Sequence, residues 1–303
     1  MSRALAAAIG LGLDRLVGEP PTRVHPLVHF GRVMGAIERR CYRDDRAAGL
    51  GYVGAGLALG ALAGCLVRST ALATALSVGG RSLSRTAAEV ADPLEAGGLD
   101  EARSRLPALV GRDPSELDEA GIARAVVESV AENTVDAIVA PALVAAALGA
   151  AGALGYRAIN TMDAMVGHRS ARYRHFGTPA ARFDDLANWV PARVTAALVA
   201  LTRPRTALAV LRAVRHQAPA HPSPNSGVAE AAFAAALGVT LGGRNVYGDR
   251  VEVRPALGTG RPARASDIAA ARRLSRDVTA ALALLLASAA LLARRSLRER
   301  SWA

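Results

Sequence analysis

The chain has 303 residues, of which 51% are hydrophobic and 21% charged, and its formal net charge at pH 7 is +11. All 37 basic residues are Arg, which excludes mechanisms that need a lysine amine, such as a Schiff base or a P-loop phosphate site. Two cysteines exclude a disulfide framework, and few aromatic residues with no recognised binding motif argue against nucleic acid as a partner.

Three stretches of the chain carry no charged residue: 47–67, 137–156 and 278–293. A bilayer core needs about 20 apolar residues per helix, so the first two are long enough to cross it. The third is shorter, but Arg294 and Arg295 can snorkel to the interface. These stretches predict membrane-spanning helices, although buried helices of an Ala-rich soluble bundle are the alternative.

Weaker apolar stretches at 4–17 and 194–202 are further candidate spans. Gly56, Gly60 and Gly64 recur every four residues in the first long stretch, a spacing that lets helices approach closely in lipid. We therefore predict an all-α, multi-pass integral membrane bundle that forms one domain over 1–303, with polar segments carrying the active site. A small hairpin within 245–253 is the exception that we allow.

Arg clusters flank the apolar stretches, at 39–46 before the first and 294–300 after the last. The positive-inside rule places both clusters in the cytoplasm. We therefore expect a cell-membrane protein whose active-site segments face the cytoplasm.

Three carboxylates lie at helical spacing in the segment ESVAENTVD: Glu128, Glu132 and Asp136. This i, i+4, i+8 spacing places them along one face of a helix that runs into the apolar stretch at Ala137. Like charges repel, so we expect a counter-charge, either a hard cation such as Mg²⁺ or Arg from another segment. A solvated acidic face is the alternative, but polar groups beside an apolar span are costly and often functional.

A second polar group follows the apolar stretch: Asn160, Asp163, Arg169, Arg172 and Arg174. Asp163 can complete the ligand shell of a metal ion. The three Arg suit a phosphate through charge-assisted hydrogen bonds, and a basic patch on the membrane surface explains them equally well.

Two further polar groups come later in the chain. Asp184 and Asp185 are adjacent and point to different faces of a helix, so one of them can simply cap or be solvated. His221 opens the loop HPSPNSG, whose Asn225 or Ser226 can cap the next helix. An ordinary capping turn does not account for His221.

Together these segments resemble the adenosylcobinamide-phosphate synthase family of cobalamin biosynthesis, the CobD/CbiB proteins. The resemblance rests on LDRLVGEPPTRVHPLVHFGRVM, ESVAENTVDAIVAP, YRAINTMDAMVGHRSARYRHFGTPAARFDDLANWVPAR, HPSPNSGVAEAAFAAALGV and NVYGDRVEVRPALG, which cover nearly the whole chain. Ala137 stands where the family usually has Gly, and His168 where an aromatic ring is common.

The resemblance implies an amide-forming ligase of the multi-pass membrane type. It would join a propionate side chain of adenosylcobyric acid to 1-aminopropan-2-ol or its O-phosphate, giving adenosylcobinamide or its phosphate. It also implies ATP and Mg²⁺ as cofactors, the lipid bilayer as surroundings and other enzymes of the cobalamin pathway as partners. The sequence has no Walker A motif, so nucleotide binding would be unconventional.

Residue roles follow from the resemblance as expectations. Metal ligands would be Glu132, Asp136 and Asp163. Catalytic residues would be Glu128, His221, Asp184 and Asp185, with Glu128 or His221 taking the proton of the attacking amine. Substrate-binding residues would be His25, Asn133, Thr134, Asn160, Arg169, Arg172, Arg174, Asn188, Arg193 and Asn225.

Two other classes of protein fit the same features. A membrane carrier for an anionic metabolite would use the same carboxylates and Arg without turning over nucleotide. A non-catalytic membrane scaffold for late corrinoid enzymes would tolerate Ala at the polar motifs. Neither explains why Asn, Asp, Glu and His lie in compact groups, so we rank the enzyme first.

Overall fold

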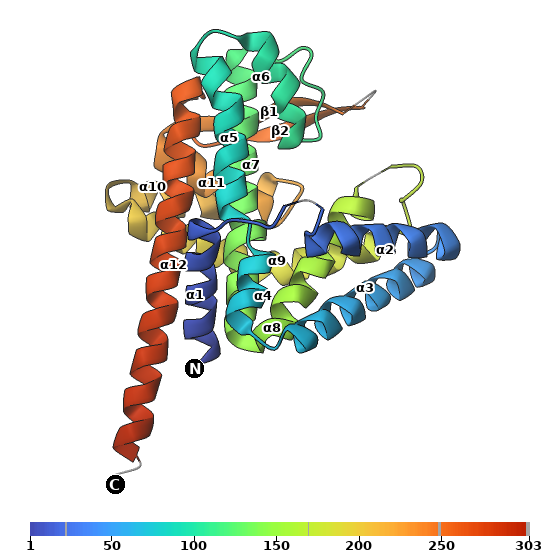
Figure 1. Cartoon of the computed structure of the whole chain (residues 1–303). Coiled ribbons are helices and arrows are strands. Elements are labelled where there is room, and N and C mark those ends of the chain that lie inside the picture. The colour runs from blue at the N-terminus through green and yellow to red at the C-terminus, as the bar shows by residue number, and fades with distance from the viewer. Residues whose placement is uncertain (22, 169, 248–249, 301–303) are drawn as a thin grey trace. The chain divides into compact units, whose positions relative to one another are not determined.

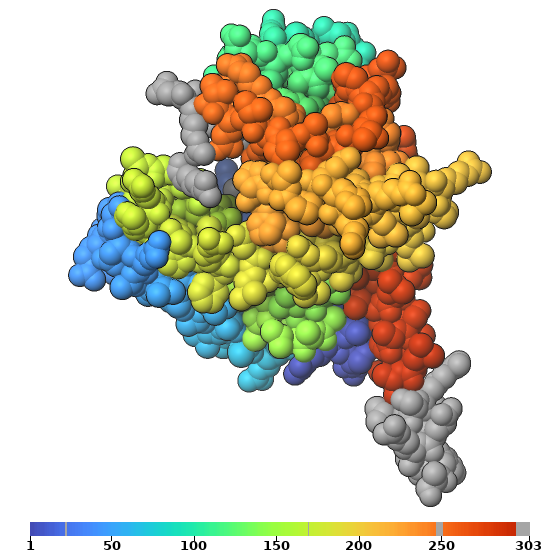
Figure 2. Space-filling model, turned by 180° about the vertical axis from the view of Figure 1, so that it is seen from behind, coloured from blue at the N-terminus to red at the C-terminus, as the bar shows by residue number. Residues whose placement is uncertain are grey.

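The computed structural model describes residues 1–21, 23–168, 170–247 and 250–300. Figure 1 shows the course of the chain and Figure 2 its surface from the opposite side. The contacts divide the chain into two units. Unit 1 comprises 1–79, 136–188 and 282–303, and unit 2 comprises 80–135 and 189–281. Both are mainly helical, and the predicted helical architecture is confirmed to that extent.

Unit 1 is built on close packing between two apolar helices. Its helices are α1 (Arg3–Leu16), α2 (Pro26–Cys41), α3 (Arg46–Val67), α4 (Thr70–Ser77), α8 (Ala140–Met162), and the π-helical turns Val135–Val139, at its boundary, and Asp163–Gly167. α3 begins at the N-cap Asp45, whose carboxylate accepts the Ala48 N–H at 2.7 Å. A Cβ at Gly60 of α3 would lie 2.8 Å from the carbonyl oxygen of Leu154 in α8. Small residues therefore let these two helices approach, as the glycine spacing predicts.

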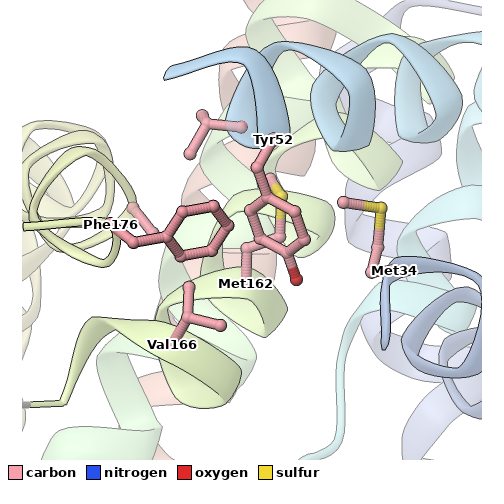
Figure 3. Close-up of a cluster of buried hydrophobic side chains, with 7 residues drawn as sticks. Met34, Tyr52, Met162, Val166 and Phe176 are labelled. Carbon is pink, nitrogen blue, oxygen red and sulfur yellow. The ribbon is translucent and has the colours of Figure 1, made fainter. Parts of the chain in front are cut away.

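Figure 3 shows a second part of the unit 1 core, where α2, α3 and α8 meet the chain after α8. Met34, Tyr52, Met162, Val166 and Phe176 are at most 2% exposed, and the rings of Tyr52 and Phe176 lie 5.2 Å apart. This core anchors the C-terminal end of α8. It thereby fixes the helix turn from which the polar residues after Tyr156 project.

Unit 2 combines helices with a small sheet. Its elements are α5 (Gly80–Glu95), α6 (Leu99–Arg105), the 3₁₀ turns Leu106–Ala108, Pro204–Thr206 and Ala218–Ala220, α7 (Glu119–Thr134), α10 (Ala207–His216), α11 (Ser226–Leu237), β1 (Val239–Tyr247), β2 (Arg250–Leu257) and β3 (Arg261–Pro262). β1 pairs antiparallel with β2 and parallel with β3. The hairpin allowed within 245–253 is confirmed, and it is longer than expected, so the fold is not purely helical. Gly242, at φ +87°, lies where the ladder register shifts.

Two helices, α9 (Thr178–Thr202) and α12 (Ala265–Arg300), run from one unit into the other. The chain also departs from expectation before α11. The side chain of the N-cap residue Asn225 makes no cap bond there; instead Ser223 Oγ accepts the N–H groups of Asn225 and Ser226 at 3.3 and 3.2 Å. Ser223 Oγ reaches the N–H groups two and three residues further along the chain, which is the spacing of a side-chain N-cap bond.

Three helical segments are long and apolar enough to cross a membrane: Arg46–Val67, Glu119–Gly167 and Ala265–Arg294. They contain the charge-free stretches 47–67, 137–156 and 278–293. Only 28% of the apolar window of Arg46–Val67 and 17% of that of Ala265–Arg294 is buried within the protein. Exposed apolar surface of that extent indicates contact with lipid or another protein.

The two weaker candidate spans have different structures. The stretch 4–17 forms α1, which at 14 residues is shorter than the bilayer core requires. The stretch 194–202 is the end of α9, after which the chain bends by 109° into Pro204–Ala220.

Candidate functional site

The clearest polar cluster of unit 1 is centred on Asp184 of α9. Its two carboxylate oxygens accept hydrogen bonds from the side-chain amides of Asn160, at 3.2 Å, and Asn188, at 3.0 Å. The buried Tyr156 hydroxyl donates to Asn188 Oδ1 at 2.8 Å, which fixes the orientation of that amide. Two amides and a phenol from α8 and α9 thus hold one carboxylate in place.

Other charged groups surround this carboxylate. Asp163 lies in the π-helical turn after α8 and is close enough to feel the charges of Asp184 and Asp185. The Arg157 guanidinium donates to Asn160 Oδ1 at 2.9 Å. The cluster therefore gathers three carboxylates, with Arg157 near Asp184 and Arg182 near Asp185.

Asp136 belongs to the same unit and lies in the π-helical turn Val135–Val139. Its backbone carbonyl oxygen lies 3.1 Å from the Tyr156 hydroxyl oxygen. A π turn is a frequent feature of functional sites, because it re-aims the residues around it. Of the three predicted carboxylates, Glu128 and Glu132 lie in α7 of unit 2, and Asp136 belongs to unit 1.

The donor set of unit 1 has the chemistry that Mg²⁺ prefers, which is carboxylate and amide oxygen. Within the part of the chain that the structure describes, no group of three or more His, Cys, Asp or Glu has the arrangement of a metal site. The predicted set of three metal ligands, Glu132, Asp136 and Asp163, is therefore not found as one group among the described residues. Mg²⁺ usually takes one or two carboxylates and completes its shell with water and substrate phosphates. Asp163 and Asp184 fit that mode better than a ready-made cage.

In unit 2, Glu128 is already neutralised by the protein. The carboxylate is 1% exposed; Oε2 accepts a hydrogen bond from Arg112, and Oε1 accepts the Gly242 N–H at 2.8 Å. Arg112 also donates to Asn245 Oδ1 at 2.8 Å. A counter-charge from another segment was expected, and Arg112 supplies it. This burial favours a structural role for Glu128, which ties α7 to β1.

His221 and Glu230 form a second buried group in unit 2. Nε2 of His221 lies 3.6 Å from Oε1 of Glu230, and the Arg254 guanidinium lies 3.7 Å from the same oxygen. Burial lowers the pKa of His221. Burial, together with the carboxylates of Glu132 and Glu128, raises the pKa of Glu230 well above its usual value. A neutral imidazole beside a protonated carboxyl is the arrangement that this environment favours.

The backbone orients His221. The Ser223 N–H and the Ser223 carbonyl oxygen lie 3.1 and 3.2 Å from His221 Nδ1, while Nε2 faces Glu230. The His221 side chain is only 1% exposed, so a substrate would reach it only after this group rearranges.

Other predicted binding residues of unit 2 are engaged within the protein. Thr134 is buried, and its hydroxyl donates to the Val130 carbonyl and contacts Ser275 Oγ at 2.8 Å. The amide of Asn133 donates to the Ser129 carbonyl at 2.9 Å. Helix packing accounts for both residues.

Arg193 is more accessible. Its guanidinium lies 4.5 Å from the centre of the Trp189 ring and donates to Asn225 Oδ1 at 3.0 Å. The Trp189 side chain is exposed, as expected for an anchor at a membrane interface.

The remaining predicted binding residues are scattered over unit 1. His25 caps α2, where Nδ1 accepts the Leu27 N–H at 3.2 Å, and its Nε2 lies 3.5 Å from Glu19. Arg172 is half-exposed and pairs with Glu38 at 3.0 Å. Arg174 is exposed, and Arg169 lies outside the described residues. A single phosphate pocket built by all three Arg is therefore not evident in the described residues.

Sequence reasoning missed several members of these groups: Arg112, Tyr156, Arg157, Asn245 and Arg254. Glu230 carried a usable signal, because it is the one charged residue in the otherwise apolar α11. Tyr156 ends a long charge-free stretch, where a hydroxyl needs a partner. Arg112 and Asn245 gave no signal, because only the fold brings them to Glu128.

Comparisons with known proteins agree with the resemblance. A family model described as CobD/Cbib protein matches residues 7–275. "Cobalamin biosynthesis protein CobD" of Mycobacterium tuberculosis (strain CDC 1551 / Oshkosh) is 47% identical over 297 residues, covering 94% of this chain and 95% of that protein. The protein of the same name from Chromobacterium violaceum is 44% identical over 310 residues, covering 96% and 98%.

A further relative, "Cobalamin biosynthesis protein CobD" of Rhodobacter capsulatus, is 38% identical over 319 residues, covering 96% of this chain and 99% of that protein. No solved structure matches the chain. The family resemblance is thus confirmed over almost the full length. The chain belongs to the CobD/CbiB family of cobalamin biosynthesis proteins.

Proposed function

We propose that this protein is an amide-forming ligase that joins a propionate carboxylate of adenosylcobyric acid to 1-aminopropan-2-ol or its O-phosphate. The product is adenosylcobinamide or adenosylcobinamide phosphate. The observation that carries the proposal is the family match over residues 7–275, which includes every polar segment described above. The family name supports the pathway, and the chemistry of unit 1 supports the reaction class.

The chemical problem is that a carboxylate does not react with an amine until one of its oxygens becomes a leaving group. Transfer of the γ-phosphoryl group of ATP to the propionate would form an acyl phosphate and ADP. The amine then attacks the acyl carbon, the C–N bond forms and inorganic phosphate leaves. One proton of the attacking ammonium must be removed.

Asp163 and Asp184 would hold Mg²⁺, which supplies charge neutralisation at the phosphates. Asn160 and Asn188 keep the carboxylate of Asp184 in one orientation, so the site needs little rearrangement on binding. Asp185, the half-buried third carboxylate of this cluster, is the residue to which we assign the role of base, accepting a proton from the attacking ammonium. We prefer it to Glu128 and His221, which the protein buries.

We further propose a multi-pass protein of the cell membrane with its polar segments on the cytoplasmic side, where ATP is available. Three candidate spans and the Arg clusters that flank them support this arrangement. Other enzymes of the cobalamin pathway would supply the amine and consume the product.

The test uses the purified full chain in nanodiscs with adenosylcobyric acid, ATP, Mg²⁺ and either amine, with mass spectrometry of the corrinoid. We expect the amide with one amine, together with stoichiometric ADP. A mock purification from cells that lack this protein serves as the control for contaminating ligase. No amide with either amine would refute the ligase. Accumulation of unchanged corrinoid in sealed vesicles would then identify a carrier.

A further inference from the structure

The exposed face of α10 is not used by either polar cluster. Leu208 and Leu211 on this helix are 60% and 54% exposed, whereas Val210 and Ala213 are buried against unit 2. Arg212 and Arg215 are exposed on the same side as the two Leu. The segment around α10, gold in Figure 2, lies at the surface. Two large apolar side chains flanked by Arg are the pattern of a helix at a membrane interface.

The bend before α10 gives this face its direction. The last part of α9 is apolar and ends at Leu201, which is 62% exposed. The chain then turns by 109°, with Arg203 and the exposed Arg205 at the turn. Arg203 pairs with Asp277 at 2.7 Å, whereas Arg205 is exposed. Because charged residues are costly in the bilayer core, Arg205 places the turn at the level of the lipid headgroups. A helix nearly perpendicular to α9 then lies along the surface.

α10 cannot itself cross the bilayer, since it has 10 residues and two Arg. Lying in the plane, it can bury both Leu among acyl chains while the Arg side chains snorkel to phosphates. A cavity of about 390 Å³ adjoins the same helix and is lined by Arg212, His216, Gln217 and Thr259 among others. The cationic end of the face therefore has room for a headgroup.

We propose that α10 is an interfacial helix that docks on an anionic phospholipid surface, with Leu208 and Leu211 below the headgroups and Arg205, Arg212 and Arg215 on the lipid phosphates. This assignment is independent of the ligase chemistry. The charge complementarity is direct, because every charged side chain of the segment 203–215 is Arg.

Spin labelling of the full chain in nanodiscs tests the immersion depth. The exposed native Cys41 and Cys65 are first replaced by Ser, and single Cys are introduced at Leu208 or Leu211. Asp100→Cys on the exposed surface of α6 is the water reference, and Leu62→Cys on the exposed apolar surface of α3 is the deep reference. We expect the ratio of oxygen to nickel-chelate collisions at both α10 sites to lie severalfold above Asp100 and below Leu62.

The second arm tests the lipid charge. Arg212→Gln and Arg215→Gln are compared with Arg85→Gln, an exposed Arg of α5, in nanodiscs with and without phosphatidylglycerol. The measurement is the ratio of phosphatidylglycerol to neutral lipid that stays bound to the protein. Because an Arg near an anionic surface contributes roughly a fivefold preference, this ratio should fall about fivefold in each α10 variant. Arg85→Gln should lose none.

Two results would overturn the proposal. Labels at Leu208 and Leu211 that match Asp100 would show that α10 faces water. Labels as deep as Leu62 would show that the segment is a re-entrant part of a span. Both substituted Leu are exposed, so the labelled variants retain the core packing of unit 2.

Discussion

The two units treat buried carboxylates in opposite ways. In unit 2, Glu128 is paired with Arg112, and Glu230 lies beside Arg254 and His221. In unit 1, Asp184 accepts hydrogen bonds from the neutral amides of Asn160 and Asn188, and further carboxylates lie near it. A charge that the fold has already neutralised serves stability, whereas one held by amides keeps its attraction for a cation. The buried carboxylates of unit 2 therefore have a structural role, whereas those of unit 1 are the candidates for chemistry.

The largest effect is expected when the Arg112–Glu128 pair of unit 2 is broken. Arg112→Ala leaves the carboxylate of Glu128 buried without its cation, which should lower the free energy of unfolding by about 3–5 kcal/mol. Thermal unfolding in detergent, followed by circular dichroism, measures the loss. Arg85→Ala, which removes an exposed pair with Glu89, is the control and should change little. Equal losses in the two variants would contradict the structural role of Glu128.

The next prediction concerns the chemistry of unit 1. Asp184→Asn keeps the shape of the side chain but removes the charge, so the Mg²⁺ concentration for half-maximal ligase activity should rise about 10–100-fold. Amide formation is measured across a magnesium titration, with thermal unfolding as a check on stability.

Asp100→Asn, on the exposed surface of α6, is the matched control. An unchanged magnesium requirement in Asp184→Asn would remove the metal role from this cluster and leave a structural one.

The next prediction concerns the close packing of α3 against α8 in unit 1. Gly60→Val would place side-chain atoms against the backbone of α8, because even a Cβ at this position would lie 2.8 Å from the Leu154 carbonyl oxygen. We expect a loss of about 1–3 kcal/mol in the free energy of unfolding. Gly54→Val is a control in the same helix, because a Cβ there meets nothing within 4 Å. If both variants lose equally, general effects of Val in the helix explain the result.

The smallest effect is a pH dependence in unit 2. Burial beside Glu132 and Glu128 raises the pKa of Glu230 above its usual value, so the folded state holds a proton that the unfolded state releases. The stability from this group is complete below the unfolded pKa and is lost as pH rises toward the folded pKa. Glu230→Gln cannot ionise, so it should gain on the wild type by about 1 kcal/mol between about pH 5 and about pH 6.

Thermal unfolding of the two proteins at each pH measures this gain. Glu116→Gln, at an exposed position, should follow the wild type at every pH. A Glu230→Gln difference that does not change with pH would show that the buried carboxyl is ionised in the folded state.

The sequence by itself determined the helical class, the apolar stretches and the family. Charge-free stretches of bilayer length and glycines every four residues are local patterns, and a helix forms from them wherever it packs. Asn160, Asp184 and Asn188 were also identifiable, because α-helical spacing already brings Asp184 and Asn188 together on one turn.

Only the tertiary structure decided which polar residues are partners. Glu128 meets Arg112 across 16 residues of chain and the Gly242 N–H across 114, and no local pattern encodes such contacts. The aligned carboxylates of 128–136 looked equivalent in the sequence, yet one is neutralised by Arg and another lies in a π-helical turn. The reason is physical: the cost of a buried charge depends on what the fold places beside it, and that neighbour comes from distant segments.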